Sequence, residues 1–319
     1  MSQAPMPRAL IVTKIPPDLR RALAAEYDLV DYPADAGSAG PFPFAPGFAI
    51  AVTMVYSGAS AALMDALPDL KLIASGGVGL DKIDLKAAAA RRIAVTHTPD
   101  ELTEDTSDAA IGLIFGVARR MVEADRFVRG GHWRNGHMSE SRRVAGRTVG
   151  IVGLGKIGRA IARKACALGM SVMYTGPRPK PDVAYSFCDS VRALAEQVNT
   201  LVLSCPGDAA TQHLIGAAEL AALGRDGILI NVSRGSVVDE PALIDALTNA
   251  TIAGAGLDVF ASEPAIDPRF QSLENVVLQP HYAAITHEMR SATTERLCRE
   301  IRAFVGGQAF LNVARVRER

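Results

Sequence analysis

Short apolar runs alternate with alanine-rich segments of helical spacing along the whole chain, and this alternation is the feature that most restricts its fold. The runs are almost continuous in apolar residues, which is typical of strands buried on both faces. The pattern therefore predicts an α/β fold in which helices cover both faces of parallel sheets. The expected strands are 9–13, 48–52, 70–74, 93–96, 148–152, 171–175, 200–204, 227–232 and 276–278, and the shorter helical segments include 58–67 and 155–168.

Two longer helical segments, 103–130 and 286–306, mark where the chain passes from one domain to another. The first carries its acidic residues early and its arginines late, which suits the helix macrodipole, and Pro99 punctuates the chain just before it. A chain of 319 residues is long enough for two domains. We therefore expect a central domain over 99–285 and a second domain formed by 1–98 together with 286–319.

The charge balance and the cysteines argue against several classes of protein. Lys and Arg total 34, as do Asp and Glu, so the chain has no overall attraction toward nucleic acid or an anionic membrane. The four cysteines form no C-x-x-C pair and have no histidine at zinc-ligand spacing, so we expect neither a disulfide scaffold nor a metal site. The uncharged stretch 36–64 is interrupted by glycine and proline, unlike a membrane-spanning helix. We expect a soluble cytoplasmic protein.

A glycine motif gives the strongest indication of a cofactor. Gly153, Gly155 and Gly158 form G-x-G-x-x-G directly after the apolar run 148–152 and at the start of an alanine-rich helical segment. The first glycine permits a tight turn, the second lets the backbone approach a pyrophosphate, and the third allows close packing of helix on strand. A tight turn without a ligand is the alternative, but this strand–turn–helix context favours a dinucleotide-binding site in the central domain.

The residues after the next expected strand, 171–175, bear on which dinucleotide is bound. An NAD site carries an acidic residue there to hold the ribose 2′-hydroxyl. Here the nearest carboxylate is Asp182, whereas Arg178 and Lys180 offer positive charge. A guanidinium suits a phosphate group through two parallel hydrogen bonds. A solvated basic loop is the alternative; together with the missing acid, the pattern favours NADP over NAD.

Three polar side chains in the central domain are candidates for catalysis. Arg234 follows the run 227–232, His281 follows the run 276–278, and Glu263 lies between them in a turn before a proline. Each one alone has a simpler explanation, as a surface ion-pair residue, a core histidine or a turn acid. Each follows the carboxyl end of a strand, where open α/β sheets bind ligands, and this grouping favours a catalytic role.

The chemistry that suits this group is hydride transfer from a nicotinamide to the C2 atom of a 2-oxo acid. The oxygen of the substrate then needs a proton, which His281 can donate near neutral pH. A carboxylate such as that of Glu263 favours the protonated imidazole and orients the ring. Arg234 can bind the substrate carboxylate and polarise the carbonyl group.

A glycine-rich loop over 75–81 follows the expected strand 70–74. Successive glycines allow backbone N–H groups to converge on an anion. The loop is either a cradle for a substrate carboxylate, formed by Val78 and Gly79, or an ordinary turn.

These pieces, taken in order, resemble the D-isomer-specific 2-hydroxyacid dehydrogenase family. Within the family the chain is most similar to the NADPH-preferring glyoxylate/hydroxypyruvate and hydroxyphenylpyruvate reductases. The matching segments are Gly77-Val-Gly-Leu-Asp81, Thr98-Pro-Asp-Glu-Leu-Thr-Glu-Asp105, Gly153 to Gly158, the Cys205-Pro206 pair, Asn231-Val-Ser-Arg-Gly235, Gly256-Leu-Asp-Val-Phe260 with Glu263-Pro264, and Pro280-His281.

The resemblance implies two flavodoxin-like or Rossmann-like domains with the active site in a cleft between them. It implies that Asp258 binds the nicotinamide carboxamide and that Arg234, Glu263 and His281 are catalytic. The cofactor-binding residues that it implies are Gly153, Leu154, Gly155, Lys156, Ile157, Gly158, Gly176, Pro177, Arg178, Cys205, Pro206, Val232, Ser233, Arg234, Asp258 and His281. The implied substrate-binding residues are Val78, Gly79, Arg234, His281 and Trp133.

The resemblance also implies a homodimer through the 103–140 region, in which Trp133 either packs in the interface or reaches the partner's substrate pocket. Two departures stand out. Tyr282 follows His281 where the family usually has small residues, which bears on substrate size, and Pro177 stands where an arginine is frequent.

The expected function is therefore NADPH-preferring reduction of a small 2-oxo acid, such as glyoxylate or hydroxypyruvate, to the D-2-hydroxy acid. The alternatives are an NAD-linked family member such as a phosphoglycerate dehydrogenase, or a nucleotide-sensing module without turnover.

Overall fold

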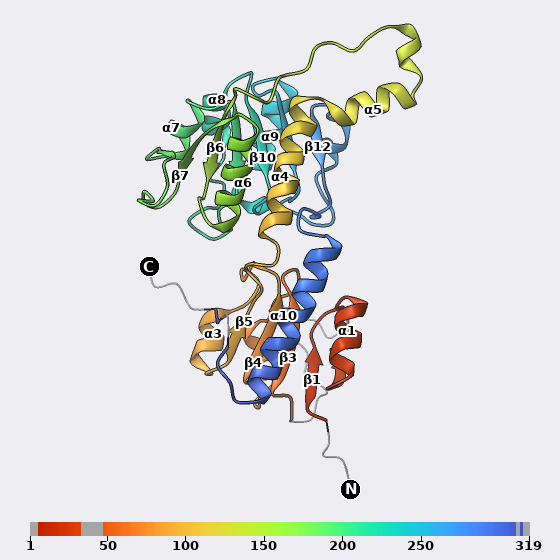
Figure 1. The fold of residues 1–319 in the computed structure, drawn as a ribbon, viewed down its shortest axis with the longest axis vertical. Helices are drawn as coiled ribbons and strands as arrows, with labels where there is room; N and C mark the ends of the chain where they lie inside the picture. The colour runs from red at the N-terminus through yellow and green to blue at the C-terminus, as the bar shows by residue number, and fades with distance from the viewer. Residues whose placement is uncertain (1–5, 33–46, 311–312, 315–319) are drawn as a thin grey trace. The chain divides into compact units, whose positions relative to one another are not determined.

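The computed structural model describes residues 6–32, 47–310 and 313–314, and it divides the chain into two compact units (Figure 1). The first unit comprises Met1–Leu102 and Thr286–Arg319, and the second comprises Thr103–Ile285. The chain therefore passes between the units twice, after Leu102 and after Ile285. Residues 36–46 of the uncharged stretch lie outside the described residues.

The first unit is built on a five-stranded parallel sheet in the order β2-β1-β3-β4-β5. Because side chains alternate across a strand, Ile11, Val52 and Leu72 pack toward α1 and α10, whereas Leu10 and Ile73 pack toward α2 and α3. The elements are β1 (Arg8–Ile11), α1 (Pro17–Ala24), β2 (Asp28–Asp31), β3 (Ile50–Met54), α2 (Ala61–Asp65), β4 (Leu72–Gly76), α3 (Leu85–Ala90), β5 (Ala94–Thr96) and α10 (His287–Val305).

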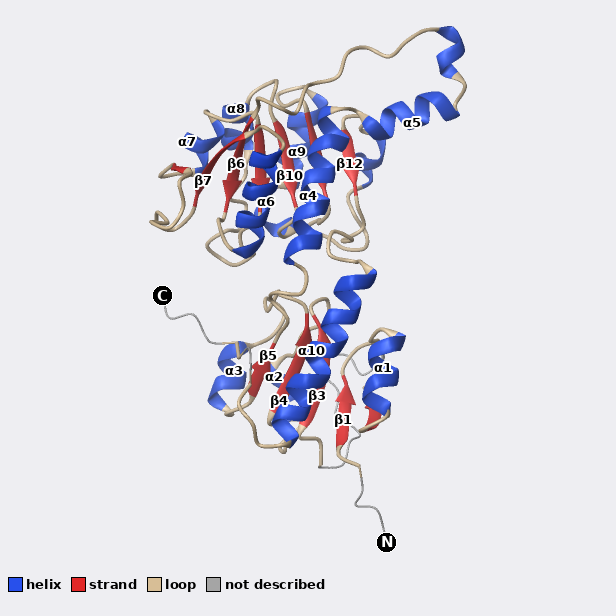
Figure 2. Ribbon diagram, in the orientation of Figure 1, coloured by secondary structure: helices blue, strands red, loops and turns tan. Residues whose placement is uncertain are grey.

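The second unit holds a seven-stranded sheet in the order β12-β11-β10-β9-β6-β7-β8, again parallel throughout. Helices lie on both of its faces (Figure 2). The strands are β6 (Thr148–Val152), β7 (Ser171–Thr175), β8 (Ser186–Phe187), β9 (Thr200–Leu203), β10 (Ile228–Asn231), β11 (Gly254–Leu257) and β12 (Val276–Leu278). The helices are α4 (Thr103–Ala118), α5 (Met121–Arg129), η1 (His132–Asn135), α6 (Lys156–Ala167), α7 (Val191–Ala195), α8 (Ala217–Leu223), η2 (Gly235–Val237), α9 (Glu240–Thr248) and η3 (Pro268–Ser272).

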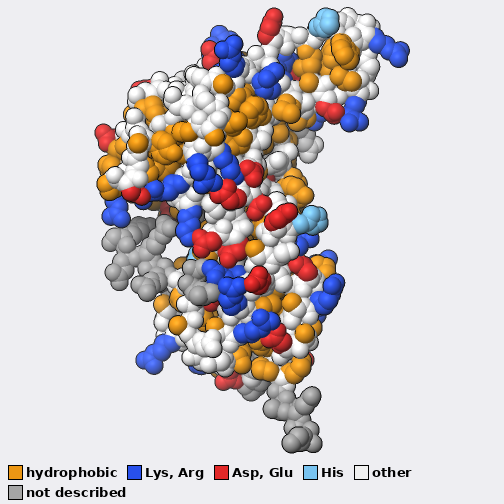
Figure 3. Space-filling model, viewed as in Figure 1, with side chains coloured by type: hydrophobic (Ala, Val, Ile, Leu, Met, Phe, Trp, Pro, Cys, Tyr) orange, Lys and Arg blue, Asp and Glu red, His pale blue; other side chains and the backbone are white. Residues whose placement is uncertain are grey.

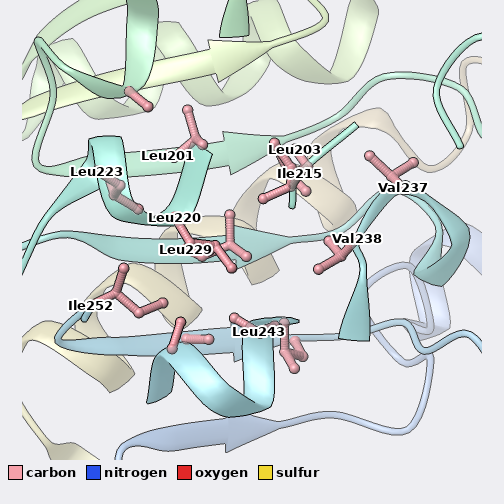
Figure 4. Packing of buried hydrophobic residues seen from close by; sticks show 14 of the residues in the cluster. Leu201, Leu203, Ile215, Leu220, Leu223, Leu229, Val237, Val238, Leu243 and Ile252 are labelled. Atoms are coloured by element: carbon pink, nitrogen blue, oxygen red, sulfur yellow. The ribbon is translucent and has the colours of Figure 1, made fainter. Parts of the chain in front are cut away.

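Two apolar cores hold this second sheet between its helices. On one face Leu201, Leu203 and Leu229 pack against α7, α8 and α9 (Figure 4). On the other face their strand neighbours Val202 and Ile230 pack against α4 and α6. The alternation of strands and helices in the sequence thus predicted the fold class correctly, and the α/β architecture with parallel sheets is confirmed.

Three strands lie outside the apolar runs that the sequence analysis identified, namely β2, β8 and β11. In β11 the reason is close packing. A Cβ atom on Gly254 would lie 2.5 Å from the carbonyl oxygen of Asn275, and one on Gly256 would lie 3.0 Å from Cβ of Leu113 in α4. Glycine is therefore required where a β-branched residue would be expected in a strand.

The expectation of one continuous helix over 103–130 is wrong. The helix α4 ends at Ala118, and Arg120 then adopts a left-handed conformation with φ of +51° before α5 begins. The side chain of Arg120 donates hydrogen bonds to Glu123 and to Ser139. The bond to Ser139 holds the break between α4 and α5 against the segment that follows η1. Charge patterning cannot reveal such a break, because it depends on contacts with a segment distant in the sequence. The second long helix, by contrast, runs over His287–Val305 as α10, capped by the side chain of Thr286.

Of the helices in the described ranges, none is both long and apolar enough to cross a membrane.

We expect Gly112→Ala to raise the free energy of unfolding by about 0.5–1 kcal/mol, because alanine restricts the unfolded chain and favours a helix interior. Gly112 is exposed in α4, and a Cβ atom there meets nothing within 4 Å. Denaturant unfolding measures the change. Gly254→Ala is the matched control and should be destabilising; a destabilised Gly112→Ala would contradict this account of α4.

Candidate active site

The topology of the second sheet creates a position for a ligand between β6 and β9. The chain runs from β6 outward through β7 to β8 and then returns to β9 on the opposite side of β6. Connections therefore leave these two neighbouring strands in opposite directions, and open α/β sheets bind ligands at the carboxyl ends of such strands. The glycine turn that follows β6 and the Cys205-Pro206 pair that follows β9 both lie at this point.

The glycine turn is shaped by close backbone packing. Gly153 has a φ of +95°, and a Cβ atom there would lie 2.7 Å from Cα of Cys205. A Cβ atom on Gly158 would lie 2.3 Å from the carbonyl oxygen of Gly153, which also accepts a hydrogen bond of 2.8 Å from the Ser204 hydroxyl. A Cβ atom on Gly155 would meet nothing within 4 Å, so the chain leaves open space there.

The turn leads directly into α6, whose N-terminus fits an anionic group. Gly155 is the N-cap residue and provides no side chain to bond the first N–H groups. Lys156 and Ile157 form the start of the helix, and Leu154 is buried beneath it. A helix N-terminus directs backbone N–H groups and a positive dipole end toward a ligand, which suits a pyrophosphate. The described residues therefore fit a dinucleotide at this position.

We expect Gly158→Ala to lower the free energy of unfolding by about 1–3 kcal/mol, because the new methyl group collides with backbone. Gly155→Ala should change stability by less than about 0.5 kcal/mol, because it points into open space. Thermal or denaturant unfolding measures both changes. If Gly155→Ala proved as destabilising as Gly158→Ala, the open space at Gly155 would not exist as described.

A histidine–carboxylate pair lies at the other end of the sheet edge. Nδ1 of His281 and Oε2 of Glu263 are 2.7 Å apart, and Oε1 of Glu263 accepts a hydrogen bond from the backbone N–H of Phe260. Burial by itself would raise the pKa of Glu263, but the bonds to His281 and Phe260 outweigh it and hold that pKa below its ordinary value. Glu263 is therefore ionised at neutral pH and orients His281, whose Nε2 atom is left for proton exchange.

The turn that carries His281 is held by Asp258. The backbone N–H of His281 donates to the carbonyl oxygen of Asp258, and its φ is +53°, in the left-handed region. Oδ1 of Asp258 accepts hydrogen bonds from the backbone N–H groups of Tyr282 at 2.7 Å and Ala283 at 3.0 Å. Burial raises the pKa of Asp258, although these bonds act against the rise. Asp258 thus positions the imidazole, a role that was not expected from the sequence.

Arg234 follows β10, the strand next to β11 in the sheet. The side-chain amide of Asn231 donates a hydrogen bond to the carbonyl oxygen of Arg234 and so fixes the backbone there. The guanidinium of Arg234 donates to the carbonyl oxygen of Ser233 at 2.7 Å. The positive charge of Arg234 also contributes to the lowered pKa of Glu263. Arg234, Glu263 and His281 therefore follow three adjacent strands, β10, β11 and β12, and lie at the same sheet edge.

Glu240, at the start of α9, also supports this edge, and no sequence pattern indicates this role. Its Oε1 atom accepts a hydrogen bond of 2.6 Å from the backbone N–H of Ala261, close to Glu263. The two partners are 21 residues apart, so no local motif connects them.

The basic loop follows β7 as expected. Gly176, Pro177 and Arg178 come directly after the strand, and the Arg178 side chain is exposed. The carboxylate of Asp182 forms an ion pair with the guanidinium of Arg159.

The remaining expected site residues lie in other parts of the described chain. Val78 and Gly79 follow β4 in the first unit, where the N–H of Gly77 donates to the Thr98 hydroxyl and the carbonyl of Val78 contacts His97. Trp133 lies in η1 with 62% of its surface exposed. Tyr282 is also largely exposed.

A seven-stranded parallel sheet with a glycine turn at its switch point, together with a histidine, an acid and an arginine along the same edge, defines an α/β dinucleotide-binding protein. Residues 111–283 match the NAD binding domain of D-isomer specific 2-hydroxyacid dehydrogenases. The chain is 44% identical over 255 residues to a glyoxylate/hydroxypyruvate reductase A of Arabidopsis thaliana, covering 80% of this chain and 82% of that protein. It is 42% identical to a hydroxyphenylpyruvate reductase of Plectranthus scutellarioides over the same shares of the two chains.

Among solved structures, the NADPH-dependent glyoxylate/hydroxypyruvate reductase of Sinorhizobium meliloti in complex with NADP and malonate has a TM-score of 0.91 to this chain. It is 38% identical, and the match covers 98% of this chain and 99% of the other. The chain belongs to the D-isomer-specific 2-hydroxyacid dehydrogenase family. It is therefore an oxidoreductase with an NAD(P)-binding domain, and the family expected from its motifs is confirmed.

Proposed function

We propose that this protein reduces small 2-oxo acids to D-2-hydroxy acids and uses NADPH in preference to NADH. The observation that carries the proposal is the pairing of His281 with Glu263 at 2.7 Å, on the sheet edge that also bears the glycine turn and Arg234. The reductases to which the chain is similar support the same class of substrate.

The side chains divide the work of the reaction between them. When bound, the nicotinamide supplies hydride to the C2 atom of the substrate. His281 donates a proton from Nε2 to the substrate oxygen, while Glu263 stabilises the charged ring and Asp258 holds its backbone. Arg234 binds the substrate carboxylate by charge-assisted hydrogen bonds. Val78 and Gly79, which follow β4 in the first unit, stay a prediction as substrate-binding residues.

The cofactor would be held by the glycine turn and by the segments after the next strands. Gly153 to Gly158, with Leu154, Lys156 and Ile157, would contact the pyrophosphate. Arg178 and its neighbours would bind the adenosine 2′-phosphate. Asp258 has a second carboxylate oxygen for the nicotinamide carboxamide, and Cys205, Pro206, Val232 and Ser233 would line the groove.

A substrate panel with both cofactors tests the proposal directly. Oxidation of NADPH and NADH is followed with glyoxylate, hydroxypyruvate, pyruvate and phenylpyruvate. Turnover faster with NADPH is the expected result. Faster turnover with NADH would identify an NAD-linked dehydrogenase, and absence of turnover with every substrate would favour a nucleotide-sensing module.

Glu263→Gln should lower kcat for reduction by about ten- to a hundredfold, because the protonated imidazole loses its negative partner. Steady-state kinetics measures the effect, and Glu196→Gln, an exposed acid on the same unit, is the control. An unchanged kcat in Glu263→Gln would contradict the role of Glu263 as the partner of His281.

Arg178→Gln should weaken NADPH binding by about tenfold or more, because a charge-assisted contact with the 2′-phosphate is lost, and leave NADH binding nearly unchanged. Fluorescence titration with each cofactor measures the ratio. Equal weakening of both cofactors would contradict the preference for NADPH.

A homodimer is part of the proposal, supported by the apolar surface of α5 and η1. Met121, Val128 and Trp133 are more than half exposed there, and apolar side chains gather on this projecting segment (Figure 3). Trp133 also lines an open apolar pocket of about 210 Å³ with Phe127 and Met138. Sedimentation analysis of the protein and of Val128→Asp tests the interface.

A cytoplasmic location also stays a proposal, which the four unpaired cysteines support.

A further inference from the structure

The loop between β7 and β8 carries the two basic residues, Arg178 and Lys180, and both of its ends are fixed. β8 pairs with β7 in parallel register, so that Phe187 lies opposite Tyr174. The backbone N–H of Cys188 donates to the carbonyl oxygen of Tyr174 at 2.8 Å, and the rings of Tyr174 and Phe187 meet edge to face at 5.3 Å between centroids. The loop therefore leaves and returns to one rigid strand pair.

A buried hydroxyl also holds the middle of this loop. Tyr174 lies on β7 with only 2% of its surface exposed, and its hydroxyl oxygen accepts a hydrogen bond of 2.6 Å from the backbone N–H of Lys180. Because the ring is fixed in the apolar core on this face of the sheet, the hydroxyl fixes the backbone between Arg178 and Asp182. The two flanking residues Pro179 and Pro181 restrict the backbone further.

An ion pair holds the far side of the loop. Nη2 of Arg159 donates to Oδ1 of Asp182 at 3.0 Å, and Nη1 lies 2.9 Å from Oδ2, so both carboxylate oxygens are engaged. The guanidinium of Arg159 holds the pKa of Asp182 below its ordinary value. Arg159 belongs to the first turn of α6, the helix that begins at the glycine turn. The Arg159 side of the ion pair is therefore attached to the helix that begins at the proposed pyrophosphate site.

Asp182 is also the nearest acidic residue after β7. In NAD sites an acidic residue in this region of the fold binds the ribose 2′-hydroxyl. A carboxylate that was not paired would attract that hydroxyl and repel a 2′-phosphate. Pairing with Arg159 offsets the charge of Asp182 and occupies both of its carboxylate oxygens, which weakens both effects.

We propose that Tyr174 and the Arg159–Asp182 pair are positioning residues for cofactor choice: they hold the loop so that Arg178 and Lys180 face an adenosine 2′-phosphate, and they keep Asp182 from a ribose 2′-hydroxyl. The inference rests on the proposed preference for NADPH. It adds that the preference depends on groups that do not themselves touch the phosphate.

Binding of two cofactor fragments tests the inference without turnover. Calorimetry on the full chain gives Kd for 2′,5′-ADP, which carries the 2′-phosphate, and for 5′-ADP, which does not. Tyr174→Phe should weaken 2′,5′-ADP by about two- to tenfold, the effect of one lost hydrogen bond, and change 5′-ADP by less than about twofold. Tyr185→Phe, in the same loop, is the matched control and should change neither.

Arg159→Gln should weaken 2′,5′-ADP and strengthen 5′-ADP, because Asp182 becomes available to the ribose. The gain for 5′-ADP should disappear in the double variant Arg159→Gln/Asp182→Asn. Arg192→Gln, which breaks a comparable exposed pair with Glu196 on α7, should alter neither fragment. If Arg159 acted only as a direct phosphate ligand, 5′-ADP would not gain affinity in the single variant, and the inference would be overturned.

Failure of this inference and failure of the proposed function give different results. If Arg178→Gln selectively weakens 2′,5′-ADP while Tyr174→Phe and Arg159→Gln do not, the positioning role alone is wrong. If the unaltered protein binds both fragments equally, the preference for NADPH and the inference built on it are both wrong. Should Tyr174→Phe unfold, the Arg159 variants still decide the outcome, because their side chains lie at the surface.

Discussion

The parallel direction of the strands in the second unit is the constraint on which the site depends. Seven strands run the same way, so every connection that leaves a carboxyl end does so at one edge of the sheet. The glycine turn after β6, Arg234 after β10, Glu263 after β11 and His281 after β12 reach that edge for this reason alone. No local interaction between these segments is needed to bring them there.

Burial and hydrogen bonding shift the pKa values of the two acids near His281 in opposite directions. Glu263 has a lowered pKa, so its contribution to stability is present above its unfolded-state pKa and is lost as pH falls through the folded-state value. Asp258 has a raised pKa, so its contribution is present below its unfolded-state pKa and is lost as pH rises through the folded-state value. The fold thus bears a cost at neutral pH to keep Asp258 beneath the histidine turn.

Much of the architecture could be predicted because its signals are local. The apolar runs of β6, β7 and β12 and the glycine spacing after β6 each lie within a few residues, and the positions followed directly. The break at Arg120, the glycine strand β11 and the support from Glu240 could not be predicted. Each depends on a partner distant in the sequence: Ser139 for Arg120, Leu113 for Gly256 and Ala261 for Glu240.

The sequence by itself determined the fold class and the family, and it selected Arg234, Glu263 and His281 as candidates for catalysis, because strand periodicity and motif spacing involve residues close together in the chain. Only the tertiary structure decided which oxygen of Glu263 meets His281, that Asp258 holds the turn beneath it, and that Asp182 is paired with Arg159. These contacts join residues 18 to 25 positions apart, and they exist only after the strands have aligned. Patterns over a few residues show which residue types follow one another along the chain. The distances between side chains and their pKa shifts depend on how the folded chain packs.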